Sequence, residues 1–151
     1  MGFKRTVGFT CGSFDLIHPG HIVMFEDAKH QCGYLIVGLQ TDPTIDRPDV
    51  KNDPVQSVQE RLEMLKAIRH IDEVIIYDTE DDLHELLKEL KPDIRIIGTD
   101  WKKSQSGFTG DDLPIKIYWH HRSHDWSSSD LRERVFKSES YGVLAFRAVL
   151  F

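Results

Sequence analysis

The chain has 151 residues, of which 40% are hydrophobic and 29% charged, and its formal net charge is −6. This length suits one domain with a single core. The negative charge argues against a nucleic-acid binder, which would normally carry a basic excess. No segment has the apolar length of a membrane span, and the N-terminus lacks the apolar core of a signal peptide. Two cysteines favour a reducing compartment over a disulfide framework, so we expect a cytoplasmic protein.

Short apolar runs alternate with helical patterns along the chain, which is typical of a parallel α/β sheet. Strands are predicted over residues 6–10, 34–39, 73–77, 94–98 and 115–119. Between them, Ile22, Phe25 and Ala28 form the inward stripe of a first helix. Ser57, followed by Glu60, predicts the capped start of a second helix.

Leucines between residues 83 and 90 mark a third helix, which Pro92 ends, and residues 127–135 predict a short fourth helix. We therefore predict a Rossmann-like, doubly wound parallel sheet of about five strands, whose ligand lies beyond the carboxyl ends of the strands. Two polar loops, 41–54 and 102–113, are expected beside that edge, the first as a lid.

The end of the chain differs in composition from the rest. The segment 138–151 begins with Ser-Glu-Ser and then becomes apolar. We divide the chain into a domain over 1–137 and a tail over 138–151. The tail is expected to pack either on a neighbouring subunit or on its own domain.

The most informative segment is 12–21, which reads Gly-Ser-Phe-Asp-Leu-Ile-His-Pro-Gly-His. It joins the first strand to the first helix, where backbone N–H groups and the positive helix end favour phosphate. Gly12 and Gly20 let the backbone approach phosphate oxygens. A single histidine at a helix start is usually a cap, whereas His18 and His21 together, in frame with Gly, Phe and Asp, favour a functional site. Zinc is disfavoured because a structural site would want thiolates, and the two cysteines are not spaced as a ligand pair.

A second cluster, residues 122–129, reads Arg-Ser-His-Asp-Trp-Ser-Ser-Ser and follows the last predicted strand. Its final hydroxyls, Ser127, Ser128 and Ser129, can cap a helix. With Arg122 they can also hold pyrophosphate or triphosphate, since Arg binds phosphate oxygens in a fork. The histidines at 120, 121 and 124 could bind metal, and a dedicated metal site there is the less favoured interpretation.

Segment 12–21 matches every fixed position of the Gly-x-Phe-Asp-x-x-His-x-Gly-His signature of the small nucleotidyltransferases. The chain resembles the cytidylyltransferase family from about residue 5 to 135, and glycerol-3-phosphate cytidylyltransferases most of all. Residues 98–101 (Gly-Thr-Asp-Trp) resemble the family's Gly-Asp-Asp-Trp, and 69–74 (Arg-His-Ile-Asp-Glu-Val) its Arg-Tyr-Val-Asp-Glu-Val. Residues 123–126 depart from the family pattern, with Ser-His-Asp-Trp in place of Thr-Glu-Gly-Ile.

The resemblance implies transfer of CMP from CTP to a small phosphate monoester, with release of pyrophosphate. The acceptor would be glycerol 3-phosphate or a related polyol, amino-alcohol or amide phosphate of surface-polysaccharide synthesis. Mg²⁺ is expected on the triphosphate, without side-chain ligands, and a homodimer is expected. The implied catalytic residues are His18, His21, Lys51 and Arg122. The implied nucleotide-binding residues are Cys11, Gly12, Ser13, Phe14, Gly20, Arg69, Gly98, Asp100, Trp101, Ser127, Ser128 and Ser129. Asp15 and Arg47 would contact the acceptor.

Two other functions stay open at this point. An ATP-dependent adenylyltransferase of cofactor synthesis would share the His-x-Gly-His site. A nucleotide- or metal-binding module without turnover is disfavoured, because a decayed enzyme would be expected to lose His18, His21 or Arg122.

Overall fold

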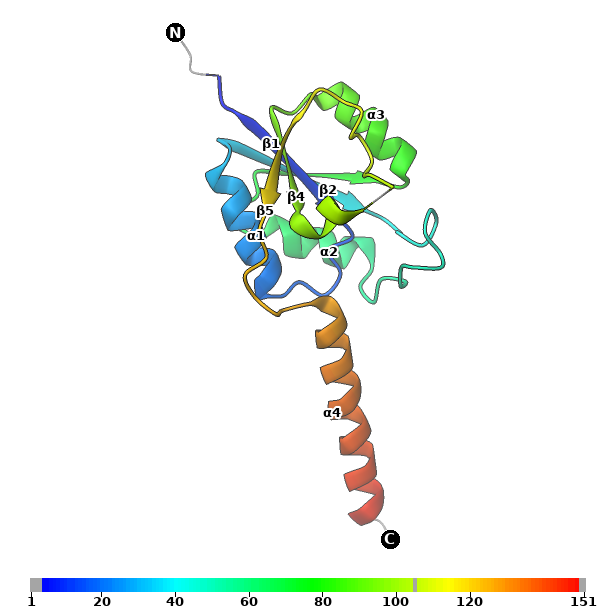
Figure 1. Cartoon of the computed structure of the whole chain (residues 1–151). Helices are drawn as coiled ribbons and strands as arrows, with labels where there is room; N and C mark the ends of the chain where they lie inside the picture. Colours follow the sequence, from blue (N-terminus) through cyan, green and yellow to red (C-terminus); the bar gives the residue numbers. More distant parts are fainter. Residues whose placement is uncertain (1–3, 105, 150–151) are drawn as a thin grey trace.

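The computed structural model describes residues 4–104 and 106–149, with side chains up to Tyr141. Its centre is one sheet of five parallel strands in the order β3-β2-β1-β4-β5 (Figure 1). The strands are β1 (Val7–Gly12), β2 (Tyr34–Gln40), β3 (Glu73–Tyr77), β4 (Ile94–Gly98) and β5 (Lys116–His120). The sequence placed each strand to within two residues, and the predicted Rossmann-like α/β fold is confirmed.

Helices α1 (Pro19–His30) and α2 (Val58–Lys66) cover one face of the sheet, and α3 (Glu80–Leu90) covers the other. A 3-10 helix, η1 (Thr99–Lys103), follows β4, and α4 (Ser128–Val149) ends the described chain. The predicted cap of α2 is present: Glu60 N–H donates to Ser57 Oγ at 3.2 Å, and Ser57 N–H donates to Glu60 Oε2 at 2.7 Å. The third helix ends before Pro92, as predicted.

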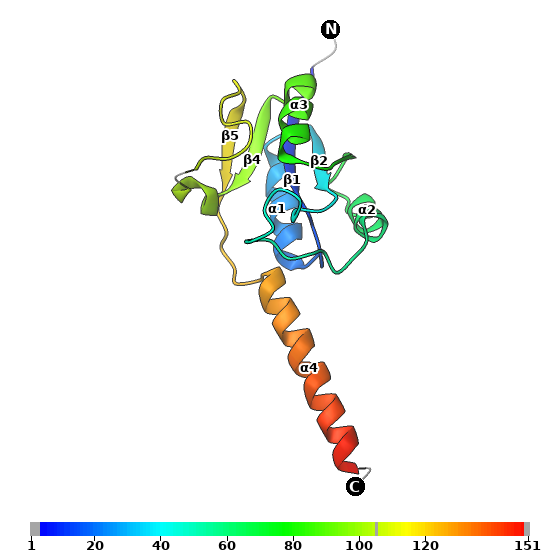
Figure 2. The same cartoon turned by 90° about the vertical axis from the view of Figure 1, so that its right-hand side faces the viewer.

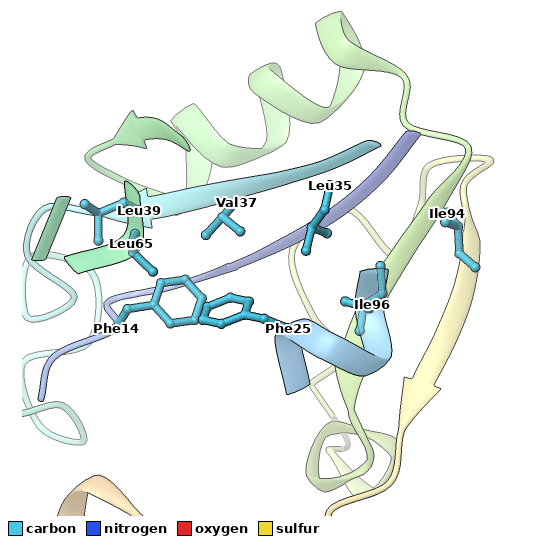
Figure 3. Packing of buried hydrophobic residues seen from close by; sticks show 9 residues of the cluster. Phe14, Phe25, Leu35, Val37, Leu39, Leu65, Ile94 and Ile96 are labelled. Atoms are coloured by element: carbon cyan, nitrogen blue, oxygen red, sulfur yellow. The ribbon is translucent and has the colours of Figure 1, made fainter. Parts of the chain in front are cut away.

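The core has two parts, one on each face of the sheet. Phe25 of α1 and Leu65 of α2 pack with buried residues of β2 on one face (Figure 3). Leu83 and Leu87 of α3 pack on the other face. Burying each large apolar side chain contributes about 1.5–3 kcal/mol. This packing holds each helix on its face of the sheet, and thereby the loops that join the helices to the strands.

Phe14 belongs to this core. It is 6% exposed, and its ring lies 5.2 Å from that of Phe25 (Figure 3). Its backbone has a positive φ of 47°, which turns the side chain back under the loop that follows β1. The Phe14 side chain therefore packs the loop on α1, and the predicted nucleotide contact of Phe14 would have to come from its backbone.

The fourth helix is much longer than predicted. It has 22 residues, and both views show it projecting away from the sheet (Figures 1 and 2). Serines weakened the helical signal after residue 137. In the structure they bond inside the helix: Ser138 Oγ donates to the Val135 carbonyl and Ser140 Oγ to the Phe136 carbonyl.

Residues 138–149 of the tail thus continue α4 and do not fold back onto the domain. Val135, Phe136 and Tyr141 are exposed on it, while the side chains of 142–151 lie outside the described residues. Across the described chain, no helix combines the length and apolarity that a membrane span requires.

Candidate functional site

The site lies beyond the carboxyl ends of β1 and β4, which are neighbours where the chain reverses its direction across the sheet. Open α/β sheets bind ligands at such a point. A cavity of about 420 Å³ opens there between the strand ends, the first turns of α3 and the two polar loops. Among the predicted residues, it is lined by Cys11, Gly12, Ser13, Arg47, Lys51, Gly98 and Trp101.

Next to the cavity loop, His18 and His21 begin α1. His18 is the N-cap, and its Nδ1 accepts the Gly20 N–H at 3.1 Å. His21 Nδ1 accepts the His18 N–H at 3.2 Å. Since each Nδ1 is an acceptor, each neutral ring carries its proton on Nε2. The local fold of the motif thus leaves two Nε2–H donors, on rings whose centres are 4.0 Å apart.

Both imidazoles are held neutral. Burial, and then the neighbouring His18 and His124, lower the pKa of His21 to about 4. Burial also lowers the pKa of His18, with smaller contributions from His124 and Arg122. At neutral pH the pair is therefore a set of uncharged donors placed at a helix N-terminus, where phosphate is favoured.

A third imidazole, that of His124, completes this cluster. A Cβ on Gly20 would lie 2.5 Å from His124 Cε1 and 2.9 Å from His18 Cε1, so only glycine lets the rings approach. The His124 ring lies 5.0 Å from that of Trp126. Its Nδ1 is buried and has no hydrogen-bond partner in the described part of the chain. The sequence singled out His124 as a departure from the family pattern and as one of three histidines that could bind metal, and did not place it beside His18.

Arg122 shapes the loop that carries His124. Its Nε donates to the His124 carbonyl at 3.2 Å, and its Nη2 to the Trp126 carbonyl at 2.6 Å. Ser127 Oγ caps α4 by accepting the Asp130 N–H at 3.0 Å. Ser128 Oγ donates to the Asp15 carbonyl at 3.3 Å. The second cluster is thus bonded to the loop that leads to His18, and Ser127 also has the capping role considered above.

Asp15 has a different surrounding from the one predicted. Its carboxylate is 6% exposed and accepts the N–H groups of Val55 and Gln56, each at 2.9 Å. It also forms an ion pair with Arg132 of α4. Protein donors thus bind both carboxylate oxygens, and Asp15 ties the motif loop to the segment before α2 and to α4; its predicted acceptor contact stays a prediction.

Arg61 of α2 is a positioning residue that sequence reasoning missed. It is 1% exposed and donates to the carbonyls of Ser13 (2.8 Å), Gln40 (2.7 Å) and Thr41 (2.6 Å). It therefore joins the loops after β1 and β2. Burial lowers the pKa of its guanidinium, and Asp15 and Asp42 oppose that shift. A signal was available, since Arg61 interrupts the apolar stripe of α2.

Arg69 is not brought to the site. It is exposed and lies between α2 and β3, at the amino end of a parallel strand. The cavity is at the opposite edge, so the prediction that Arg69 reaches the phosphates from within this chain is wrong. Asp100 and Trp101 lie in η1, where both are exposed. A Cβ on Gly98 would meet nothing within 4 Å, so the space beside it is open.

The described residues contain no group of three or more His, Cys, Asp or Glu side chains that could hold a metal ion.

Comparison with known proteins identifies the family of this chain. The chain is similar to the bifunctional protein HldE of Caulobacter vibrioides, with 42% identity over 95 residues, which are 63% of this chain and 20% of that protein. It is also similar to the bifunctional protein HldE of Campylobacter jejuni, with 37% identity over 131 residues, or 87% of this chain and 28% of that one. The chain thus spans between a fifth and under a third of these relatives.

A similar solved structure is that of the lipopolysaccharide core biosynthesis protein from Thermoplasma volcanium. It has 28% identity and a TM-score of 0.63, and the match covers 81% of this chain and all of that one. Pantothenate synthetase from Thermus thermophilus, at 13% identity and a TM-score of 0.60, shares the fold. The family model described as cytidylyltransferase-like matches residues 9–134. The chain therefore belongs to the cytidylyltransferase-like family of nucleotidyltransferases.

Proposed function

We propose that the protein transfers a nucleoside monophosphate from a nucleoside triphosphate to a small phosphate monoester. A phosphate oxygen of the acceptor attacks the α-phosphorus, a new P–O–P bond forms, the bond to the bridging oxygen breaks, and pyrophosphate leaves. The observation that supports this reaction best is the His18–His21 pair, whose two Nε2–H donors stand at the N-terminus of α1.

The reaction needs little covalent help from the protein, since positioning and charge stabilisation supply most of the rate. Negative charge grows on the bridging oxygen as it leaves. His18 and His21 would donate to that oxygen and to its phosphates, and such contacts strengthen in the transition state. Arg122 and the hydroxyls of Ser127–Ser129 would hold the β- and γ-phosphates. Lys51, which lines the cavity, would approach the reacting phosphates from the lid loop, on the acceptor side. A general base is not required, because the attacking phosphate is already an anion.

We propose that Mg²⁺ accompanies the triphosphate and offsets part of its charge. Phosphate oxygens and water would be its main ligands.

For the nucleotide we propose CTP, because residues 98–101 resemble the cytidylyltransferase turn and close β4 beside open space. ATP is the second candidate. One observation favours it: residues 123–126 depart from the cytidylyltransferase pattern. The proposed acceptor is a polyol or sugar phosphate of surface-polysaccharide synthesis. It is supported by the similarity to a structure named for lipopolysaccharide core biosynthesis.

The test is release of pyrophosphate by the purified chain with each of the four nucleoside triphosphates. The acceptors would be glycerol 3-phosphate and sugar 1-phosphates of five to seven carbons. We expect turnover with one nucleotide far above the other three, and a loss on the order of a hundred-fold in His21→Ala. Turnover by a folded His21→Ala variant at the normal rate would contradict the proposed role of the pair. No pyrophosphate from any combination would contradict the proposed reaction with these acceptors.

A further inference from the structure

Arg95 of β4 is a buried guanidinium that faces the cavity. Its partner in register is Phe9 of β1, which belongs to the core on the α3 side. Arg95 is 4% exposed, yet it lines the cavity together with Cys11 and Lys51. Its side chain therefore lies on the face of the sheet opposite to α1 and its histidines.

The contacts of Arg95 leave its charge uncompensated. Its Nη1 donates to the Thr109 carbonyl, its Nη2 lies 3.8 Å from Cys11 Sγ, and its guanidinium lies 5.2 Å from the Phe108 ring centre. Its Nε has no hydrogen-bond partner within the described residues, nor does any carboxylate there form an ion pair with it. A buried charge without a counter-ion is costly. An anionic ligand in the cavity would supply the missing counter-charge.

The candidate counter-ion within the cavity, Glu80, already has partners. Its Oε1 accepts from Arg47 at 2.9 Å and from Gln40 at 3.4 Å, and its Oε2 accepts the Thr109 hydroxyl. Among the described residues that line the cavity, Glu80 is the one carboxylate, against the three cations Arg47, Lys51 and Arg95. The cavity is thus positive within a chain whose net charge is −6.

Lys51 points to the same chemistry. Burial and the neighbouring Arg47 lower its pKa, and Glu80 opposes that shift only in part. A phosphate group in the cavity would offset the cost of burying the charges of Arg95 and Lys51, because hydrogen bonds between charged partners are strong.

We propose that Arg95, with Lys51, binds the phosphate group of the acceptor in this cavity. The inference rests on the proposed nucleotidyl transfer and names the residues that select its second substrate. The triphosphate would lie at the N-terminus of α1, on the other face of the sheet from the Arg95 side chain, so the phosphate group proposed for Arg95 is that of the acceptor. A volume of about 420 Å³ suits a small phosphorylated sugar or polyol. Gly12 and Ser13 line the same cavity, which connects it to the loop that leads to His18.

The first test needs no turnover and reads the unpartnered atom directly. The ¹H–¹⁵Nε signal of Arg95 is assigned as the one missing from Arg95→Lys, and the wild-type chain is titrated with inorganic phosphate. We expect this signal to shift and to saturate, while that of exposed Arg5 stays in place. An Arg95 signal that does not move at millimolar phosphate overturns the proposal, whatever the enzyme assay shows.

The second test connects the cavity to the reaction. With the nucleotide and acceptor that give pyrophosphate, Arg95→Met is expected to raise the KM for the acceptor ten-fold or more and to leave the KM for the nucleotide within two-fold. Arg95→Lys keeps the charge and should recover part of the loss. Arg5→Met removes one exposed guanidinium at the amino end of β1 and serves as the matched control.

The outcomes separate this inference from the proposed function. A folded Arg95→Met enzyme with normal acceptor KM, or with only the nucleotide KM raised, overturns the role of Arg95 and leaves nucleotidyl transfer intact. Absence of turnover in the wild type contradicts the proposed function instead, and the phosphate titration then still decides whether the cavity binds anions. If Arg95→Met does not fold, Arg95→Lys carries the same comparison.

Discussion

The depressed pKa of His21 makes a specific prediction about stability and pH. Burial holds this pKa near 4, against 6.5 for an ordinary histidine. As the pH falls, the unfolded chain therefore takes up the proton first. The contribution of His21 to the free energy of unfolding is full above about pH 6.5 and is lost as the pH falls toward 4.

The size of the effect follows from the shift. A difference of about 2.5 pKa units corresponds to roughly 3 kcal/mol once the loss is complete. Linkage between the two states gives a loss of about 2 kcal/mol between pH 7.5 and pH 5. His21→Gln removes the titrating ring and keeps a side-chain donor, so it should remove this part of the pH dependence.

Urea unfolding of the wild type and His21→Gln at pH 7.5, 6 and 5 measures the difference. We expect the free energy of unfolding of the wild type to fall by about 2 kcal/mol more than that of the variant over this interval. His30→Gln, at the other end of α1 and exposed, is the matched control and should follow the wild type. Parallel curves for the wild type and His21→Gln would refute the claim that the ring is buried and neutral.

Three further predictions concern Asp15, Arg122 and the oligomeric state. Asp15→Asn should cost about 3 kcal/mol and lower the Tm by roughly 6–12 °C, because it removes the charge that pairs with Arg132; a change below 2 °C in thermal unfolding would speak against that role. Arg122→Lys should weaken nucleoside triphosphate binding about ten-fold in calorimetry, since a two-pronged donor is lost, whereas unchanged binding would restrict Arg122 to holding its loop. Sedimentation velocity should show a homodimer for the full chain, and a comparison with a chain ending at Lys137 tests whether α4 carries the interface: a full-length monomer at micromolar concentration contradicts the dimer, and a dimer that survives truncation places the interface elsewhere.

The sequence predicted the fold well because the signals involved are local. The alternation of apolar runs with helical stripes located each strand, and the Ser57–Glu60 pair fixed the start of α2. The His-x-Gly-His motif located the site because a strand, a turn and a helix N-terminus follow one another within it. Such features depend on neighbours in the chain, which a sequence contains in full.

The individual roles of polar residues were harder to predict because they depend on distant partners. Asp15 is tied to Val55 and Arg132 across the fold, and Arg61 reaches Ser13 from another helix. Arg69 was placed at the site by resemblance alone, whereas the parallel sheet puts it at the opposite edge. Composition and spacing do not show which distant side chain or backbone group a polar residue will contact.

The length of α4 was missed for a different reason, which is local. Serines lower helix propensity when counted alone, but Ser138 and Ser140 donate to carbonyls of the preceding turn. The Glu133–Lys137 pair adds a contact one turn apart. The serines therefore do not end the helix, and their hydroxyls bond within it.

The central claim is that this chain joins a nucleoside monophosphate to a phosphate monoester through a new P–O–P bond. ³¹P NMR of the reaction tests it most directly, with the chain, Mg²⁺, a nucleoside triphosphate and the acceptor in one tube. We predict that the acceptor's monoester signal and the triphosphate signals decay together, while a pair of coupled diphosphate-ester signals and free pyrophosphate grow in equal amounts. Release of orthophosphate with the acceptor signal unchanged, or no change with either CTP or ATP across the acceptors, would contradict the claim.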